Sequence, residues 1–265
     1  MKGRGRQRWV CLLCCLGLSL VAAGQGKGEN PDETQANPGR PTISTPATLT
    51  PVGYLQFESG LLTAWQSPEF SSQQSVNEVI KFALNRRLEL ICSLQPYAHT
   101  NSEPRNAPGD VLLGVQAVIH HGEGAGPTIA VSYLGRAYSG TSPNLDIGSA
   151  AHTVNLLVSA DVKGFQYDTN YLFSDVEDGR VNRAQFSQTL SISHPIKGKW
   201  QAGGEIWHFT QPFLRSRAVG NLWNVSYAAK KNLVFDAGFN HGLTSTSTHW
   251  ELFAGFTYVL PKKLW

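Results

Sequence analysis

Hydrophobic and polar residues alternate with a period of two along most of the chain after Val52. In the segment 165–173 the odd positions are mostly aromatic, whereas the even positions carry Gln, Asp, Asn and Leu, and 184–196 and 250–260 alternate similarly. Successive side chains of a β-strand point to opposite faces, so this pattern predicts strands. Comparable segments are 53–66, 76–84, 88–95, 111–121, 128–138, 152–162, 200–209, 219–229 and 233–243. The sequence predicts about twelve strands of about ten residues, enough to cross a bilayer when tilted.

Short and long connections alternate between these strands. The short ones are 85–87, 122–126, 163–164, 197–199 and 230–232; the longer ones are 67–75, 96–110, 139–151, 174–183 and 210–218, with 244–248 as the exception. In outer-membrane barrels, short turns face the periplasm and long loops face outward. We therefore expect an all-β, antiparallel, up-and-down transmembrane β-barrel with both termini on the periplasmic side.

Charged residues concentrate on one face of the strands. The more apolar face carries Glu78, and the opposite face carries Glu58, Lys81, Glu89, Arg136, Asp161, Asp168, Glu205, Asp236 and Glu251. A basic residue on the lipid face at mid-bilayer costs about 2–4 kcal/mol, so we expect these nine to line the lumen. Their acidic bias predicts a preference for cations or neutral solutes. A solvated salt-bridge lining that braces the barrel is the alternative, with Lys81 paired to Glu89.

Two further expectations follow from the same assignment of faces. Asp161 and Asp168 become diagonal neighbours near the turn at 163–164, where like charges repel. Aromatic residues near strand ends are expected to form interfacial girdles, and they are Trp65, Trp200, Trp207, Phe209, Trp250 and Tyr258.

The first 51 residues differ in character from the rest. Basic residues between Lys2 and Arg8 precede the apolar stretch 9–22 and the small residues 22–24, which predicts a signal peptide over 1–24. Residues 25–51 are rich in Pro and nearly free of apolar side chains, which predicts a disordered tail or tether. Residues 52–265 form the predicted barrel. Removal of the signal takes away three of the four cysteines and leaves Cys92.

Net charge and motifs exclude several classes of function. The formal net charge of +3 depends on four basic residues in the predicted signal, so we expect no nucleic-acid partner. His120 and His121 are adjacent in a strand and face opposite ways, so they cannot chelate one metal ion. Gly122–Gly126 precedes no helix, and no G-x-S-x-G motif occurs. We expect no metal, no cofactor and no catalytic residues, and hence no enzyme.

The end of the chain is similar to that of a bacterial family. Asp236, Gly238, Gly242, Leu243 and Thr244 match a D-x-G-x-x-x-G-L-T segment that is followed by a terminal aromatic strand, here 250–258. The opening 53–60 also resembles the first strand of that family, which is labelled the MetA-pathway of phenol degradation or "transporter" family. The resemblance implies a porin-like outer-membrane β-barrel. A departure is Lys263, which interrupts the apolar row before the terminal Trp265.

The sequence predicts a channel or transporter of the bacterial outer membrane for passive movement of small hydrophilic or aromatic solutes. Its partners would be outer-membrane lipid and the barrel-assembly machinery. Two other classes stay open. A barrel-embedded lipid hydrolase would need a serine beside an outward histidine such as His194 or His208, and neither has an obvious serine on its face. A secreted, soluble β-sandwich would bind its ligand without a membrane.

Overall fold

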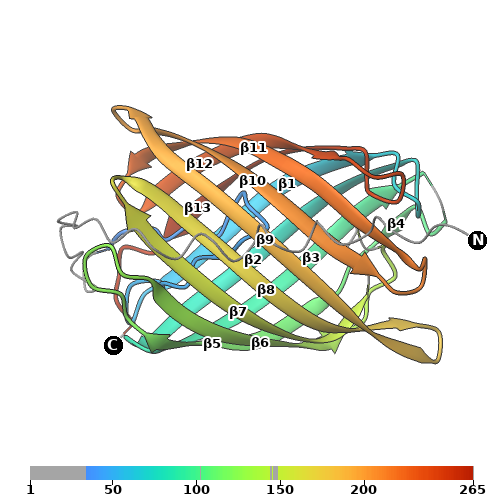
Figure 1. Cartoon of the computed structure of the whole chain (residues 1–265), viewed down its shortest axis with the longest axis horizontal. Coiled ribbons are helices and arrows are strands. Elements are labelled where there is room, and N and C mark those ends of the chain that lie inside the picture. The colour runs from blue at the N-terminus through green and yellow to red at the C-terminus, as the bar shows by residue number, and fades with distance from the viewer. Residues whose placement is uncertain (1–33, 102, 144, 146–148, 265) are drawn as a thin grey trace, which may run out of the picture.

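The computed structural model describes residues 34–101, 103–143, 145 and 149–264, and its strands form one closed barrel (Figure 1). The strands are β1 (Leu55–Trp65), β2 (Ser72–Asn85), β3 (Leu88–Thr100), β4 (Asn106–Ala107), β5 (Val111–His120), β6 (Thr128–Tyr138), β7 (Ala150–Val162), β8 (Phe165–Asp178), β9 (Val181–Lys197), β10 (Trp200–Gln211), β11 (Ser216–Lys230), β12 (Leu233–Gly242) and β13 (Trp250–Val259). In these residues, no helix is long and apolar enough to cross a bilayer.

Antiparallel pairing of sequence neighbours builds the wall, and β1 closes it by pairing with β13. The short β4 lies in a loop and pairs only with β3, so twelve strands form the closed barrel in the described chain. Closure leaves no unpaired sheet edge, which a sheet in lipid requires. The prediction of an up-and-down barrel is confirmed, and the two-sheet sandwich is excluded because all strands belong to one sheet.

The predicted strand positions agree closely with the observed ones, and the largest differences occur at one end of the barrel. The segment 128–138 coincides with β6, whereas β8 and β9 continue to Asp178 and Val181. The predicted long loop 174–183 is therefore a tight turn, because its acidic and polar residues remain hydrogen-bonded in a hairpin that extends beyond its neighbours. The tight turn at 163–164 has positive φ at both residues, as a two-residue hairpin requires.

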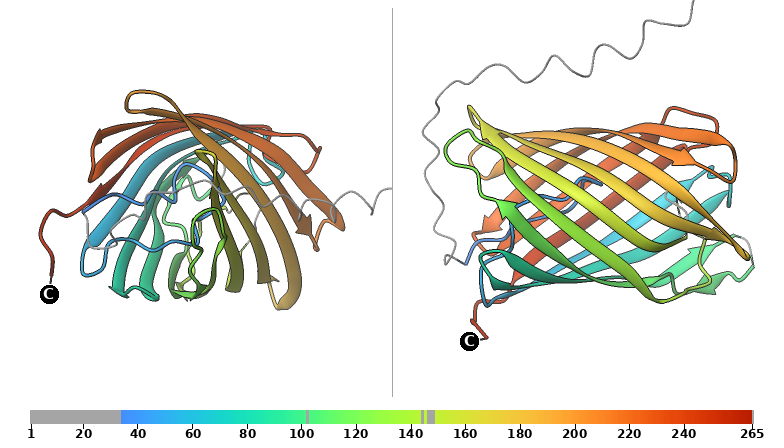
Figure 2. Two further views of the ribbon diagram at one scale, coloured as in Figure 1. Left: turned by 60° about the vertical axis from the view of Figure 1, so that its left-hand side comes forward. Right: turned by 60° about the horizontal axis from the view of Figure 1, so that its bottom comes forward.

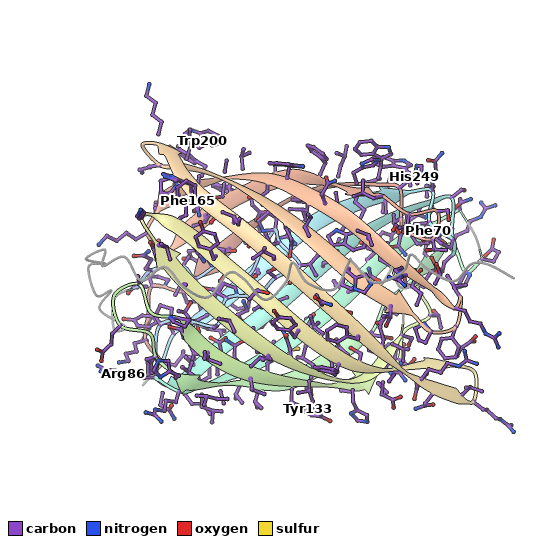
Figure 3. The ribbon with its side chains drawn as sticks, viewed as in Figure 1. Phe70, Arg86, Tyr133, Phe165, Trp200 and His249 are labelled. Carbon is purple, nitrogen blue, oxygen red and sulfur yellow. The ribbon has the colours of Figure 1, made fainter. Side chains whose placement is uncertain are left out.

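Apolar side chains cover the outer surface. Leu61, Phe173, Ile206 and Trp223 are each more than half exposed. Figure 3 shows Tyr133, Phe165 and Trp200 on the outside of the wall. Glu78 pairs in register with Ser59, whose side chain is on the same outward face. This arrangement places apolar groups against lipid and polar groups inside, as the alternation predicts.

Two of the six predicted girdle aromatics face the interior instead. Trp65, Trp200 and Trp250 are exposed on the outer surface, whereas Trp207 is 0% exposed and Phe209 is 2% exposed inside the barrel. The prediction is wrong for these two because they alternate in phase with Glu205, which also faces inward on β10.

Candidate functional site: a chain segment inside the lumen

The lumen is lined by polar side chains from every part of the wall. On β7, β8 and β9 the buried inward residues include Thr153, Asn155, Ser159, Asp168, Asn170, Ser174, Gln185, Ser187, Thr189 and Ser191. Water or a polar solute can exchange hydrogen bonds with such groups, whereas a sealed apolar core offers none.

Residues 34–51, which we call the luminal segment, enter this lumen and turn back to the start of β1. Figure 2 shows the segment, in blue, within the barrel. Its first described part lies at the end of the barrel that carries the turn between β11 and β12. There the Ala36 amide donates to the Lys231 carbonyl at 2.9 Å. Ser44, Ala47 and Thr50 are buried. The expected disorder of residues 25–51 is therefore wrong for 34–51, and residues 25–33 lie outside the described part.

Carboxylates of the wall accept hydrogen bonds from the backbone of the luminal segment. Glu205 Oε2 accepts from the Ile43 amide at 2.7 Å, and Glu205 Oε1 accepts from the Ser44 amide at 2.7 Å and from Ser44 Oγ at 2.6 Å. Glu89 Oε2 accepts from the Thr50 amide at 2.7 Å and from its hydroxyl. Bonds to a charged acceptor are about twice as strong as neutral ones.

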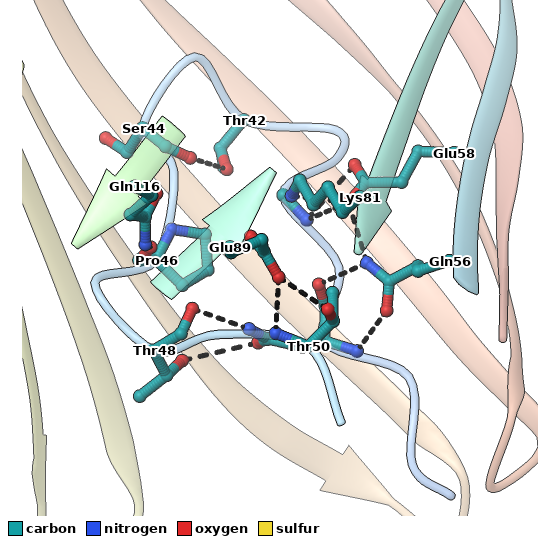
Figure 4. A network of polar contacts seen from close by, with 12 residues as sticks. Thr42, Ser44, Pro46, Thr48, Thr50, Gln56, Glu58, Lys81, Glu89 and Gln116 are labelled. Atoms are coloured by element: carbon teal, nitrogen blue, oxygen red, sulfur yellow. Dashed lines mark hydrogen bonds and ion pairs between the residues drawn. The ribbon is translucent and has the colours of Figure 1, made fainter. Parts of the chain in front are cut away.

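Amide side chains complete this recognition of the backbone. Gln56 accepts from the Asn37 amide at 2.9 Å and donates to the Asn37 carbonyl at 2.8 Å. Asn170 makes the same two contacts with Thr45, at 2.7 and 2.9 Å. Gln116 donates to the Pro46 carbonyl at 3.1 Å (Figure 4). An irregular segment has no regular internal hydrogen bonds, so wall side chains supply the partners that its buried backbone needs.

Glu58, Lys81 and Arg40 form the charged part of the network. Lys81 Nζ pairs with Glu58 Oε1 at 2.6 Å, and Glu58 also accepts from the Gly39 amide at 3.1 Å. The expected partner, Glu89, instead binds Thr50. Arg40 pairs with Asp236 at 3.3 Å, and it is the charged side chain that the luminal segment brings into the network. Buried charges are tolerated here because each has an opposite charge or several hydrogen bonds.

Arg40 lies flat against two glycines that pair across β1 and β13, Gly60 and Gly255. A Cβ on Gly60 would be 2.1 Å from Arg40 Nη2, and one on Gly255 would be 2.8 Å from the same atom. No larger residue leaves room for the guanidinium. The glycine pair therefore forms a slot for Arg40.

Apolar contacts hold the same segment at two places. Ile43 packs on the inward cluster of Trp207, Phe209 and Ala218. Ala47 and Leu49 pack inside the lumen against Val118, Ala130 and Leu157, on β5, β6 and β7.

Most of the predicted lumen residues lie inside, and several of them bind the luminal segment. Glu58, Lys81, Glu89, Asp168, Glu205, Asp236 and Glu251 are buried in the barrel. Asp168 accepts from Ser159 at 2.5 Å and from Gln166 at 2.9 Å. Arg136 lies at the other end and pairs with Glu177.

Asp161 is the exception. It shares the inward face of β7 but is exposed at the end of the strand, where it accepts from the Gly164 amide at 3.1 Å. It stabilises the tight turn, and its carboxylate is exposed to solvent, whereas the carboxylate of Asp168 is buried and accepts its own hydrogen bonds.

Sequence reasoning missed Gln56, Gln116, Asn170 and the luminal segment itself. A Pro-rich segment with few apolar side chains gives no signal for burial by hydrogen bonds. The available signal was the excess of inward carboxylates over inward basic side chains on the wall.

Closed wall, apolar exterior and polar lumen define a β-barrel of the bacterial outer-membrane type. The family model described as "Putative MetA-pathway of phenol degradation" matches residues 33–260, and the chain belongs to that family. No curated protein sequence matches the chain.

Solved structures with the same fold are outer-membrane channels and porins. The COG4313 outer membrane channel from Pseudomonas putida F1 is 12% identical, with 81% of this chain and 98% of that chain covered and a TM-score of 0.55. The NanC porin is 10% identical, with 78% and 100% covered and a TM-score of 0.55. The KdgM porin in complex with disordered oligogalacturonate is 12% identical, with 77% and 98% covered and a TM-score of 0.54. At these identities the likeness concerns the fold.

Proposed function

We propose that the protein is a passive outer-membrane channel for small solutes and that the luminal segment controls how wide it is. The observation that carries the proposal is the polar lumen inside a closed, apolar-faced barrel. Solved structures of the same fold are channels and porins, which supports the proposal. Outer-membrane lipid and the barrel-assembly machinery are the partners that such a barrel needs.

With the luminal segment in place, the passage is narrow. A barrel of about twelve strands has a small lumen that side chains can largely fill, and here the luminal segment also occupies it, both where it enters and where it turns back. Conduction of anything larger than water and small ions therefore requires displacement of residues 37–50. Displacement exposes Glu58, Glu89, Glu205 and Asp236, whose hydrogen bonds to the segment are then replaced by water.

The displaced state is expected to favour cations or neutral solutes, because the carboxylates outnumber the basic side chains on the exposed wall. The nine lumen residues predicted from the sequence differ in their expected effect on selectivity, according to whether they are buried inside the barrel or exposed at its end. Asp168 and Glu205 act on selectivity because they are inside the barrel, whereas Asp161 contributes little because it lies at the exposed turn.

No catalytic role is part of this proposal. His194 and His208 are on the outward face of their strands. His194 Nδ1 is 2.6 Å from the carbonyl oxygen of Pro195, the next residue in the chain. The hydrolase alternative has no serine–histidine pair to support it among the described hydrogen bonds.

Planar-bilayer recordings of the purified protein test the proposal. We expect small conductance from the wild type and a several-fold larger conductance when residues 37–50 are replaced by a short Gly-Ser linker. In the linker variant, Asp168→Asn and Glu205→Gln should each reduce the reversal potential in a KCl gradient, whereas Asp161→Asn should not. A linker variant that folds but conducts no more than the wild type refutes the role of the segment, and absence of any current from both refutes the channel.

A further inference from the structure

The wall of the lumen contacts the luminal segment mainly through the backbone of the segment. In the described chain, seven amides of the segment donate to wall side chains, at positions 37, 39, 43, 44, 45, 47 and 50. Four carbonyls accept from the wall, at positions 37, 45, 46 and 47. Every peptide carries such groups whatever its sequence, so these contacts fit an extended peptide in general.

Two amide side chains each recognise a complete peptide unit. Gln56 bonds both the N–H and the C=O of Asn37, and Asn170 does the same with Thr45. This is the pair of bonds that a residue makes with its partner in an antiparallel sheet. Gln56 is on β1 and Asn170 on β8, half-way round the closed barrel. A solute that lacks a donor and an acceptor side by side satisfies only half of each group.

Prolines fall between the amides that donate to the wall. Pro38, Pro41 and Pro46 have no N–H and need no acceptor, and Pro46 contributes its carbonyl to Gln116 instead. Proline also fixes φ, which lowers the conformational entropy that an irregular chain loses when it binds. A peptide with prolines at intervals therefore suits this wall better than a flexible chain of the same length.

The charge of the site favours a cationic peptide. Among the described residues, the wall contributes four acidic side chains and one basic side chain to the network, namely Glu58, Glu89, Glu205, Asp236 and Lys81. Arg40 of the segment pairs with Asp236 at 3.3 Å and lies in the slot between Gly60 and Gly255. An acidic side chain at the place of Arg40 would meet Asp236 with like charge.

We propose that the lumen is a binding site for a short, extended peptide that contains proline and arginine and takes the place of the luminal segment. The inference rests on the proposed channel function, because it names the class of solute that reaches the wall when the segment is displaced. A tethered segment competes at a local concentration on the order of millimolar. The segment therefore sets the affinity that a free peptide needs in the intact protein.

Isothermal titration calorimetry in detergent tests the inference without a channel current. The protein is the variant in which a Gly-Ser linker replaces residues 37–50. The probes are a peptide with the sequence of residues 37–50 and an unrelated peptide of equal length made of Arg-Pro-Thr repeats. We expect both to bind this variant saturably, and neither to bind the wild type at micromolar concentration. Exchange of arginine for glutamate in either peptide should weaken binding at least tenfold.

Two further comparisons locate the contacts. Methylation of the 37–50 peptide at the amide nitrogens of Ser44 and Thr45 removes donors to Glu205 and Asn170, and should weaken binding at least tenfold. In the linker variant, Asn170→Leu should have an effect of the same size. The matched control, Asn155→Leu, makes the same change at an inward position of β7 that has no hydrogen bond to the segment among the described residues, and should bind normally.

Three results overturn the inference. Equal binding to the wild type and the linker variant, or equal binding to the two asparagine variants, places the peptide outside the site. Undiminished binding of the methylated peptide refutes recognition of the backbone. Binding of the 37–50 peptide without binding of the repeats shows that the wall holds only its own segment. If the linker variant fails to fold, Ser44→Pro in the intact chain, which removes two donors to Glu205, takes its place.

Conductance separates this inference from the proposed function. A linker variant that conducts but binds neither peptide refutes the peptide site alone. A protein that binds the peptides but never conducts refutes the channel function.

Discussion

Glu205→Gln tests how strongly the wall holds the luminal segment. The carboxylate accepts three hydrogen bonds, from the Ile43 amide, the Ser44 amide and the Ser44 hydroxyl, at 2.6–2.7 Å. Glutamine has nearly the same size but keeps one acceptor oxygen, and its NH₂ group faces backbone donors. The substitution therefore removes charge-assisted bonds without opening a large cavity.

The expected effect is large enough to measure. A hydrogen bond to a charged group contributes about 1.5–3 kcal/mol, and part of the loss is recovered when water solvates the displaced state. We therefore expect a net loss of about 2–3 kcal/mol. Since about 1.4 kcal/mol is a factor of ten, the displaced population rises about 30- to 150-fold.

Single-channel recording is the assay, and the fraction of time in the larger conductance is the readout. The matched control is Glu78→Gln, which removes an acid from the outward face of β2 and should behave like the wild type. If Glu205→Gln folds and its open fraction equals that of Glu78→Gln, then Glu205 does not hold the segment, and the reasoning from these contacts is wrong.

Three further predictions concern the same barrel. Gly60→Val should displace Arg40 from its slot and raise the open fraction, whereas Leu61→Val, at the neighbouring exposed position of β1, should leave the open fraction unchanged; equal recordings from both would contradict the slot. Lys81→Met should lower the free energy of unfolding by about 3–5 kcal/mol in urea titration, because Glu58 loses its ion pair while buried, and a loss below 1 kcal/mol would argue for a solvated pair. Trp207→Ala should destabilise the barrel by about 3–5 kcal/mol, because a fully buried ring that contacts Ile43 and Phe209 is removed. The control is Trp200→Ala, which removes a ring from the exposed surface. On gels of heated samples, Trp207→Ala should lose the mobility of the folded barrel at a lower temperature than Trp200→Ala.

The sequence by itself determined the barrel. Alternation of apolar and polar residues depends on the geometry of a single strand, and the tight turns depend on residues such as Lys163 and Gly164 that adopt positive φ locally. Strand positions, the inward direction of Glu58, Glu89 and Glu205, and the outer-membrane class could therefore be predicted without knowing which strands meet. The family resemblance in the closing hairpin agreed with the family match.

Only the tertiary structure decided what fills the lumen. Residues 34–51 have too few apolar side chains to indicate burial, and their partners, Glu89, Gln116, Asn170 and Glu205, come from strands far apart in the sequence. The packing of Trp207 over Gly220 and of Phe253 over Gly238 likewise depends on which strands become neighbours. Period-two alternation tells which face a residue is on, whereas its partner across the lumen depends on closure of the barrel, which no local pattern encodes.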